Sequence, residues 1–397
     1  MKKIRISKKI FIVGVLCLSS FLLAVVLMLV RDGIIQKQLS QQMAVRWNEE
    51  GGVTQISAFF TRKAGVTKEQ IIGFEHSLDS ALQEASVKLE SENPGARLWT
   101  DAYSAQGTLM VSTDRAMLSL KAIGVGGDFF QFHPQNLLYG NYFNENDINQ
   151  DYVVIDEEIA WQLFGGIEVP GKIIDVNGKP HVIAGVIKRP QGKMEQRAGL
   201  ADPIIYVSYE TLQESGMADP INHFEIVMPN PIKGFAMDMV KKNLTVDEKE
   251  SEFIENSTRY SYDHCLKLLG EFSYRSMNGK AIIYPYWENI ARGKEDILAI
   301  LTTFVVIFIA VPSLIIAIWL IYRWRHKKWT WKSVWDKLTR ALENARSRRK
   351  SAKNRTQKDK AEKTEKKKTE KRKAGKALEP RKPIHITFDE EEENEEE

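Results

Sequence analysis

Two long apolar runs without a charged residue constrain this chain more than any other feature. Residues 10–30 form an uncharged run of 21 residues, and residues 297–322 form one of 26. An α-helix rises about 1.5 Å per residue, so either run can cross a hydrocarbon core about 30 Å thick. The sequence therefore predicts two transmembrane helices with residues 31–296 between them.

Basic residues flank both runs and predict the orientation of the chain. Cationic segments are retained on the cytoplasmic side of a membrane. The flanking cations are Lys2, Lys3, Arg5, Lys8 and Lys9 before the first run, and Arg323, Arg325, Lys327 and Lys328 after the second. We therefore expect a two-pass plasma-membrane protein with a cytoplasmic N-terminus at residues 1–9, a cytoplasmic C-terminus, and an extracytoplasmic domain at residues 31–296.

A cleaved signal peptide is the alternative interpretation of the first run. Signal peptides have an apolar core of about 7–15 residues and small residues before the cleavage site. The first run is longer than such a core, and no site of this kind precedes Arg31. The sequence therefore favours an uncleaved anchor at residues 10–30.

Charge is distributed very unevenly along the chain. Residues 31–322 carry 26 Lys and Arg against 37 Asp and Glu, whereas residues 323–388 have a net charge of +18 and residues 389–397 one of −8. An acidic outer domain does not favour binding to nucleic acid. Residues 345–397, polybasic and then acidic, have few apolar residues to bury and are predicted to be disordered. The polybasic part is expected to contact the anionic inner leaflet of the bilayer.

Residues 323–344, between the second run and this tail, predict an amphipathic helix. Their apolar residues follow helical spacing from Trp331 to Leu342. Tryptophan prefers the membrane interface, so we expect this helix to lie on the inner leaflet; a docking helix for a cytoplasmic partner is the alternative. The predicted membrane-interface residues are Trp324, Trp329, Trp331, Trp335, Arg323, Lys327 and Lys328.

The 266 residues between the runs alternate between strand and helix patterns, which indicates a mixed α+β domain, with room for two subdomains. A capping box from Thr67 to Gln70 predicts the start of a helix that ends before Asn93. Strands are predicted at residues 53–60, 96–103, 108–112 and 117–125.

The clearest pattern lies between residues 121 and 187. A strand at 152–155 is followed by a helix that Asp156 caps and Gly165 ends. Asn177-Gly178 predicts a hairpin, because both residues tolerate positive φ. Its strands lie at 173–176 and 181–187; further strands are predicted at 203–208 and 223–228 and a helix at 232–243, after which the pattern weakens.

An ordered series of residues within this region carries a family resemblance. The series is Gly124, Gly126, Gly127, Asp128, Phe129, Phe130, Gly140, Asp156, Phe164, Gly165, Gly171 and Gly185. It resembles the MacB-type periplasmic core domain of ABC-transporter permeases, in the FtsX-like permease superfamily, over about residues 50–230. We expect structural roles for these residues: Gly126 and Gly127 permit a turn that sets Phe129 and Phe130 into the core.

The resemblance implies an extracytoplasmic domain that works in a permease dimer with a cytoplasmic ABC ATPase. The usual family member has four spans, whereas this sequence predicts two. The leading hypothesis is therefore a non-catalytic, permease-like subunit of a bacterial ABC-type transport assembly. It would form a homo- or hetero-oligomer with a second permease subunit, and its outer domain would bind or gate a peptide, lipid or protein partner. The alternative is a two-span sensor or scaffold that uses the same domain without transport.

No motif in the sequence predicts an enzyme, a cofactor or a bound metal. The outer histidines, His76, His133, His181, His223 and His264, show no metal-ligand spacing, so surface or local hydrogen-bonding roles are expected. The glycines at 124–127 lack the Lys-Ser/Thr of a phosphate loop. Cys17 and Cys265 are the only cysteines, which leaves the outer domain without an internal disulfide.

Overall fold

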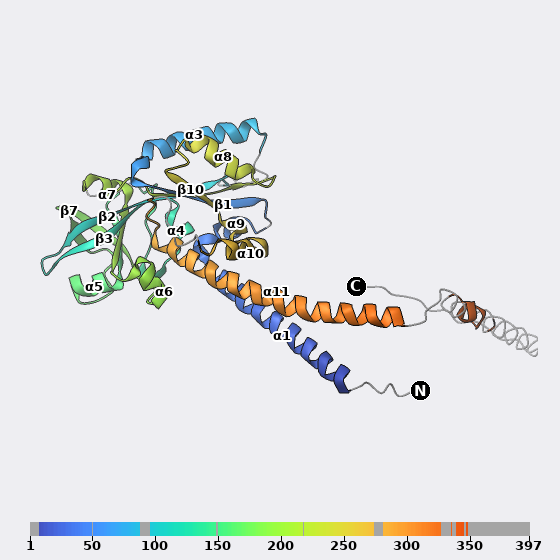
Figure 1. The fold of residues 1–397 in the computed structure, drawn as a ribbon. Coiled ribbons are helices and arrows are strands. Elements are labelled where there is room, and N and C mark those ends of the chain that lie inside the picture. The colour runs from blue at the N-terminus through green and yellow to red at the C-terminus, as the bar shows by residue number, and fades with distance from the viewer. Residues whose placement is uncertain are drawn as a thin grey trace, which may run out of the picture. The chain divides into compact units, whose positions relative to one another are not determined.

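The computed structural model describes residues 8–49, 51–87, 96–147, 150–216, 218–273, 281–326, 335, 339–344 and 347. The chain divides into two compact units, Met1–Leu314 and Ile315–Glu397. The first unit contains a mixed sheet with the order β10-β1-β9-β2-β3-β8-β5-β7-β4, and β6 pairs with β2 and β7 (Figure 1). The strands are β1 Val53–Phe60, β2 Thr100–Ser112, β3 Met117–Gly127, β4 Asn136–Gly140, β5 Tyr152–Asp156, β6 Ile173–Val176, β7 Lys179–Lys188, β8 Ile204–Ser208, β9 His223–Pro229 and β10 Ser251–Glu255.

Two strand pairs are parallel, β3 with β8 and β5 with β7, and the other pairs of the described strands are antiparallel. Strand β1, next to the edge strand β10, lies between β9 and β10, which come some 170 to 200 residues later in the chain. The start and the end of the outer domain are therefore joined in one sheet.

Helices cover both faces of the sheet. Helices α3 (Lys68–Glu84) and α8 (Phe235–Leu244) lie on one face (Figure 1), where Phe74 packs edge-on against Phe224 with ring centroids 5.2 Å apart. The remaining α-helices of the described outer domain are α2 Met43–Trp47, α4 Phe129–Phe132, α5 Glu157–Phe164, α6 Lys193–Glu195, α7 Tyr209–Glu214, α9 Asn256–Arg259 and α10 Tyr262–Glu271.

Most predicted elements are confirmed, with local corrections. The strand at 53–60, the Thr67 capping box, the Asp156 cap and the hairpin at Asn177-Gly178 are all present. The helix after Thr67 ends at Glu84, earlier than predicted, and the predicted strands 96–103 and 108–112 form the single strand β2. Elements β10, α9 and α10 lie in the stretch where the sequence pattern was too weak to predict them.

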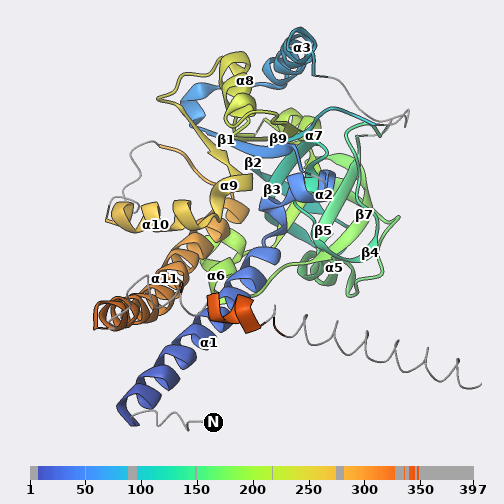
Figure 2. The same cartoon turned by 90° about the vertical axis from the view of Figure 1, so that its right-hand side faces the viewer.

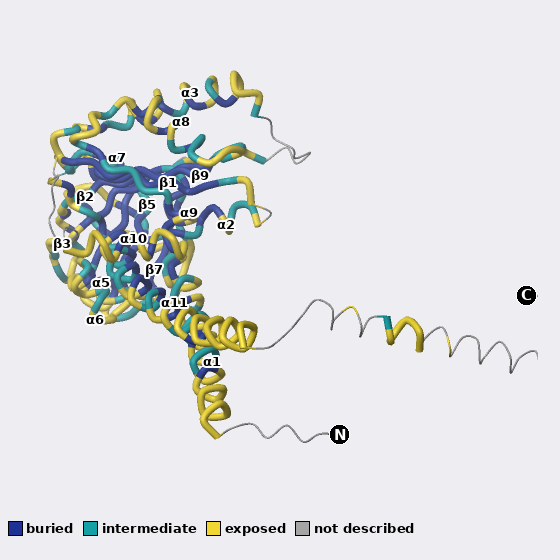
Figure 3. Tube along the Cα trace, turned by 45° about the vertical axis from the view of Figure 1, so that its right-hand side comes forward, coloured by how far each residue is buried: buried dark blue, intermediate teal, exposed yellow. Residues whose placement is uncertain are grey.

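Helices α1 (Lys8–Gln36) and α11 (Tyr286–His326) are both long and apolar enough to span a membrane. Figure 3 shows much of α1 exposed, in contrast to the buried strands. The two helices contact each other, since the Ser20 hydroxyl donates to the Phe308 carbonyl at 2.9 Å. Helix α11 begins eleven residues before the predicted run at 297–322, and these added turns belong to the outer domain.

The described residues of the second unit include two of the predicted interface tryptophans, Trp324 and Trp335, which are 74% and 68% exposed. Arg323 lies over the Trp319 ring, 5.2 Å from its centroid. Lys327, Lys328, Trp329 and Trp331 lie outside the described residues, as does most of the predicted helix at 323–344. Of the predicted tail at 345–397, only Ser347 is described.

Candidate coupling site at the base of the second apolar helix

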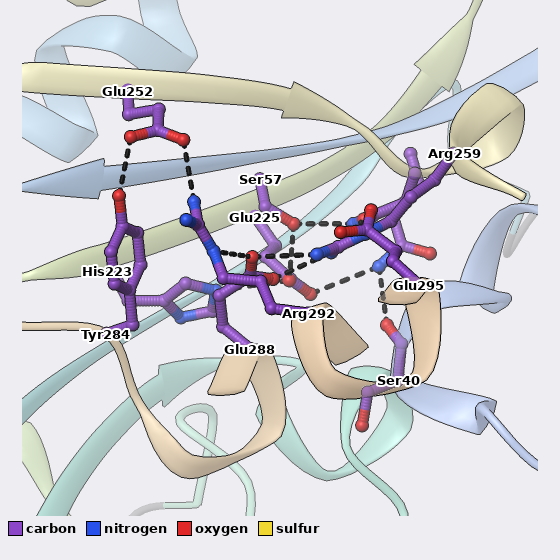
Figure 4. Close-up of polar contacts among 12 residues, drawn as sticks. Ser40, Ser57, His223, Glu225, Glu252, Arg259, Tyr284, Glu288, Arg292 and Glu295 are labelled. Carbon is purple, nitrogen blue, oxygen red and sulfur yellow. Dashed lines mark hydrogen bonds and ion pairs between the residues drawn. The ribbon is translucent and has the colours of Figure 1, made fainter. Parts of the chain in front are cut away.

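A buried arginine joins the outer domain to the start of α11. Arg259 ends α9 and is 1% exposed. Its two terminal nitrogens donate to both carboxylate oxygens of Glu288 at 2.7 and 2.8 Å, and its Nε donates to Glu295 (Figure 4). Burial alone would lower the pKa of Arg259, but the two carboxylates raise it well above its ordinary value. Arg259 is therefore held as a cation between two carboxylates of α11.

Arg292 extends this contact to the sheet. Its Nε donates to Glu288 at 2.8 Å and its Nη2 donates to Glu252 of β10 at 2.6 Å. The guanidinium also lies 3.8 Å from the ring centroid of Tyr284, whose hydroxyl donates to Glu252. We call Glu252, Arg259, Glu288, Arg292 and Glu295 the Arg259 network; it ties β10, α9 and α11 together.

Helical spacing explains why three members of the Arg259 network share one face of α11. Glu288, Arg292 and Glu295 are separated by four and three residues, so their side chains project in similar directions. Glu288 and Glu295 are 1% and 5% exposed. Removing one partner from a buried ion pair costs about 3–5 kcal/mol, because the remaining charge is left without compensation.

Hydrogen bonds continue from the Arg259 network into the sheet. Arg259 donates to the Asn256 side-chain carbonyl at 3.1 Å, and the Asn256 amide donates to the Ser57 hydroxyl at 2.6 Å. Ser57 in turn donates to Glu225 of β9 at 2.6 Å. Figure 4 shows Ser57 and Glu225 beside the arginine and its carboxylates. A carboxylate in the middle of the sheet is thus linked to α11 through side chains.

The same carboxylate is linked to the segment that follows α1. Gln55 donates to Glu225 at 3.2 Å and to the Ser40 carbonyl at 2.7 Å, while the Met43 amide donates to Gln55 at 2.8 Å. The polar chain therefore begins on α11, crosses β1 and β9, and ends at the connection between α1 and the sheet.

A second buried arginine fastens α1 itself. Arg31 is 4% exposed, and its Nε donates to the Thr302 hydroxyl of α11 at 3.1 Å. Its guanidinium also donates to the Tyr260 carbonyl and lies 4.2 Å from the Tyr262 ring centroid. Figure 2 shows α9 and α10 beside the first turns of α11, where these contacts form. Both apolar helices are therefore attached to the same short helical segment of the outer domain.

The first turn of α11 is also part of the apolar core. Trp287 is 4% exposed, and its ring lies 5.5 Å from Phe129 and 4.3 Å from His133, between centroids. The Tyr286 and Tyr206 hydroxyls are 2.8 Å apart. Polar and apolar contacts together anchor α11 in the outer domain before its membrane-length run begins.

The residues of the predicted family series lie outside the Arg259 network, and two of them belong to this core. Phe129 and Phe130 of α4 are buried in the cluster that contains Trp287. At Gly127 φ is +62°, and a Cβ there would lie 2.5 Å from the Asp101 carbonyl oxygen. Asp128 accepts hydrogen bonds from Arg97 and Thr100 at 2.6 Å each.

The other members of the series lie in turns and close contacts. A Cβ at Gly124 or Gly126 would clash with Leu212 or Tyr103, and one at Gly140 or Gly185 would clash with the facing backbone. Asp156 caps α5 by accepting from the Glu158 amide at 2.9 Å. Gly165 and Gly171 have positive φ, and Phe164 is half-buried beneath Lys172.

Two histidines have surroundings that the sequence did not predict. His133 and His223 are both fully buried, and their ring nitrogens lie close to the Glu225 carboxylate. Burial lowers the pKa of His133 to about 3, so its imidazole is neutral. The expectation of surface or local hydrogen-bonding roles was therefore wrong for His133, because residues far apart in sequence meet in the sheet. His181 is buried and contacts the Lys179 carbonyl, whereas His76 and His264 are exposed.

Comparison with known proteins relates this fold to a transporter family. The model of the MacB-like periplasmic core domain matches residues 12–245. The ABC transporter permease YvrN of Bacillus subtilis, itself described as uncharacterized, is 28% identical over 127 residues, which are 31% of either chain. The macrolide export ATP-binding/permease protein MacB of Pasteurella multocida is 28% identical over 189 residues, 44% of this chain and 28% of that one.

A solved structure, the periplasmic region of MacB from Actinobacillus actinomycetemcomitans, aligns with 54% of this chain and 92% of its own length, at 15% identity and a TM-score of 0.34. That likeness is too weak to bear on the family assignment. The chain spans less than a third of the length of the two curated relatives above. The family model, in contrast, covers more than half of the 397 residues. The chain therefore belongs to the MacB-like periplasmic core domain family and carries a domain of the ABC transporter permease type.

Proposed function

We propose that this chain is a non-catalytic, permease-like subunit of an ABC-type assembly in a bacterial plasma membrane. In this proposal α1 and α11 are transmembrane helices, both termini are cytoplasmic, and residues 31–296 are outside. The observation that carries the proposal is the attachment of α11 to the sheet by the Arg259 network and Trp287.

The geometry supports a mechanical role for α11. Its first turns are held by buried ion pairs and aromatic contacts, and the same helix continues into the apolar run. A displacement of that run would therefore move β10 and α9 with it. Arg31 adds a contact between α1 and α11, so a movement of one helix would displace the other.

The proposed partners follow from the family. The MacB relatives are named as ATP-binding and permease proteins in one, and this chain has no motif for binding ATP. As partners of this chain we propose a cytoplasmic ABC ATPase and a second permease subunit, either another copy of this chain or a different permease. The outer domain would bind or gate an extracytoplasmic peptide, lipid or protein, and Arg323, Trp324 and Trp335 would lie at the inner membrane interface.

Purification of the tagged full chain from its native membranes in mild detergent tests this proposal. We expect mass spectrometry to identify an ATPase in stoichiometric amount, and deletion of residues 323–345 to remove it. ATP should then alter the protease sensitivity of the outer domain in the wild-type assembly, and the Arg259→Met variant should lose that response. The matched control is Glu214→Gln, which removes an exposed ion pair with Lys179.

The alternative function is a two-span sensor or scaffold. In this alternative the two candidate spans only anchor the outer domain in the membrane. Recovery of the chain without any ATPase, with only outer-surface proteins or alone, would exclude the coupled assembly and leave this alternative.

A further inference from the structure

Three buried side chains of metal-ligand type meet in the outer domain beside α11. His133 follows α4, and His223 and Glu225 lie two residues apart on β9. Each offers a ligand atom, and the three atoms lie within 4.8 Å of one another. His223 Nε2 is 3.1 Å from one carboxylate oxygen of Glu225, and His133 Nε2 is 3.5 Å from the other. The two histidines are 0% exposed and Glu225 is 1% exposed.

The histidine nitrogens lack the hydrogen bonds that burial requires. Among the described residues, neither nitrogen of His133 has a partner, and His223 Nε2 has none despite its short distance to Glu225. A neutral imidazole has one donor and one acceptor nitrogen, and buried polar atoms are normally paired. Among the described residues, the Nε2 atoms of both histidines therefore lie beside one carboxylate without a hydrogen bond, which points to a ligand between the three side chains.

The distances fit a first-row divalent cation. Zinc binds imidazole nitrogen and carboxylate oxygen at about 2.0–2.2 Å, and tetrahedral ligands at that radius lie about 3.4 Å apart. The Nε2 atoms of His223 and His133 lie 3.1 and 3.5 Å from different oxygens of Glu225, close to this value, and one ligand atom from each residue lies within 4.8 Å of the other two. Two imidazoles and one carboxylate form a donor set typical of zinc and related metals.

Neighbouring groups hold two of the three ligands in orientation. The Ser104 hydroxyl lies 3.3 Å from His223 Nδ1, which leaves Nε2 directed toward the cluster. Ser57 and Gln55 both donate to Glu225. Outer hydrogen bonds of this kind orient metal ligands in known sites. Trp287 covers the histidines, with its ring centroid 4.3 Å from His133 and 5.1 Å from His223.

We propose that His133, His223 and Glu225 bind one divalent transition-metal cation of the zinc class. The cation joins the end of α4 to β9 directly beneath Trp287, so it stabilises the apolar contacts that hold the first turn of α11. Ser57 and Asn256 connect the same carboxylate to Arg259. The site does not depend on the proposed transport function, because a sensor or scaffold would need the same attachment of α11.

Metal titration of the full chain tests the proposal. The protein is purified in detergent without a histidine tag, stripped with a chelator, and reloaded with zinc or cobalt. We expect about one equivalent of bound zinc by mass spectrometry and a visible cobalt spectrum of four-coordinate type. Chelation should lower the midpoint of thermal unfolding, and zinc should restore it.

Variants assign the cation to these residues. His133→Gln and His223→Gln should each lose the bound equivalent and the response of the midpoint to zinc. His181→Gln is the matched control, because His181 is buried but bonded to the Lys179 carbonyl. Equal zinc binding by His133→Gln and wild type would overturn the proposal. If the variants do not fold, the cobalt spectrum of the wild-type protein decides. The proposal would be overturned if the wild type showed no four-coordinate cobalt spectrum, or if His181→Gln also lost the bound metal.

Discussion

The Arg259 network and the family series at 124–185 are built in different ways. The series consists of glycines, aromatic residues and helix caps, which lie in turns and close contacts. The Arg259 network consists of charged side chains that join three elements. All five of its residues lie beyond residue 245, where the match to the family model ends. The fold and its attachment to the second apolar helix are therefore specified by different parts of the chain.

The largest effect should come from breaking the attachment. Arg259→Met leaves Glu288 and Glu295 buried without their cation, and we expect a loss of about 3–5 kcal/mol in the free energy of unfolding. Denaturant unfolding of the full chain in detergent measures this loss. Arg62→Met is the control, since Arg62 is 64% exposed in its pair with Asp219. Replacing Arg259, Glu288 and Glu295 together with Met should recover much of the stability. If Arg259→Met were as stable as Arg62→Met, the Arg259 network would not hold α11 in the outer domain.

Gly127→Ala tests the other region. The alanine would have to adopt a positive φ, and its Cβ would lie 2.5 Å from the Asp101 carbonyl oxygen. We therefore expect a loss of about 1–3 kcal/mol in the free energy of unfolding. Gly166→Ala is the matched control, because a Cβ there meets nothing within 4 Å. The same unfolding experiment compares them. Equal stabilities would mean that the turn after β3 tolerates a side chain.

Within the described part of the chain, Asp101 has no arginine partner, in contrast to Glu288. Burial, and then the charges of Glu75 and Glu145, raise its pKa well above the ordinary value. The folded protein therefore binds this proton more tightly than the unfolded chain, and stability falls as pH rises from about 4. We expect Asp101→Asn to stabilise the protein by about 1 kcal/mol at pH 7, and by less near pH 4. Unfolding at both pH values checks this; a benefit that grows toward pH 4 would contradict the assigned sign.

The smallest effect is expected on the surface. Lys179 and Glu214 form an ion pair in which both side chains are more than 60% exposed. Solvent screens such pairs, so Lys179→Gln should leave the unfolding midpoint unchanged within error. A clear shift would mean that buried and exposed ion pairs cannot be ranked by exposure in this protein.

Local signals explain which parts of the fold could be predicted from the sequence. Asp156, Gly165 and Asn177-Gly178 act on residues next to them in the chain, and the elements that they bound were predicted closely. The join of two predicted strands into β2 was missed because its middle, around Gln106 and Gly107, has no apolar alternation. Elements β10 and α9 have short, polar sequences that predict no element by themselves.

The candidate sites could not be predicted because they depend on contacts between distant residues. Arg259 and Glu288 are 29 residues apart, and His133 precedes Glu225 by some 90. Neither pair has the short spacing that marks a helix pair or a metal motif. Only the order of strands in the sheet brings them together. One signal was present: Glu288, Arg292 and Glu295 follow helical spacing just before an apolar run.

The position of β1 has a consequence for synthesis of the chain. This strand is made early, yet its partners β9 and β10 emerge from the ribosome some 170 to 200 residues later. Proteins with such distant pairings fold slowly and expose strand edges until the pairing is complete. Strand β1 therefore lacks its first partner until β9 is made and its second until β10 is made, shortly before α11. Insertion of the second apolar helix and completion of the sheet become nearly simultaneous events.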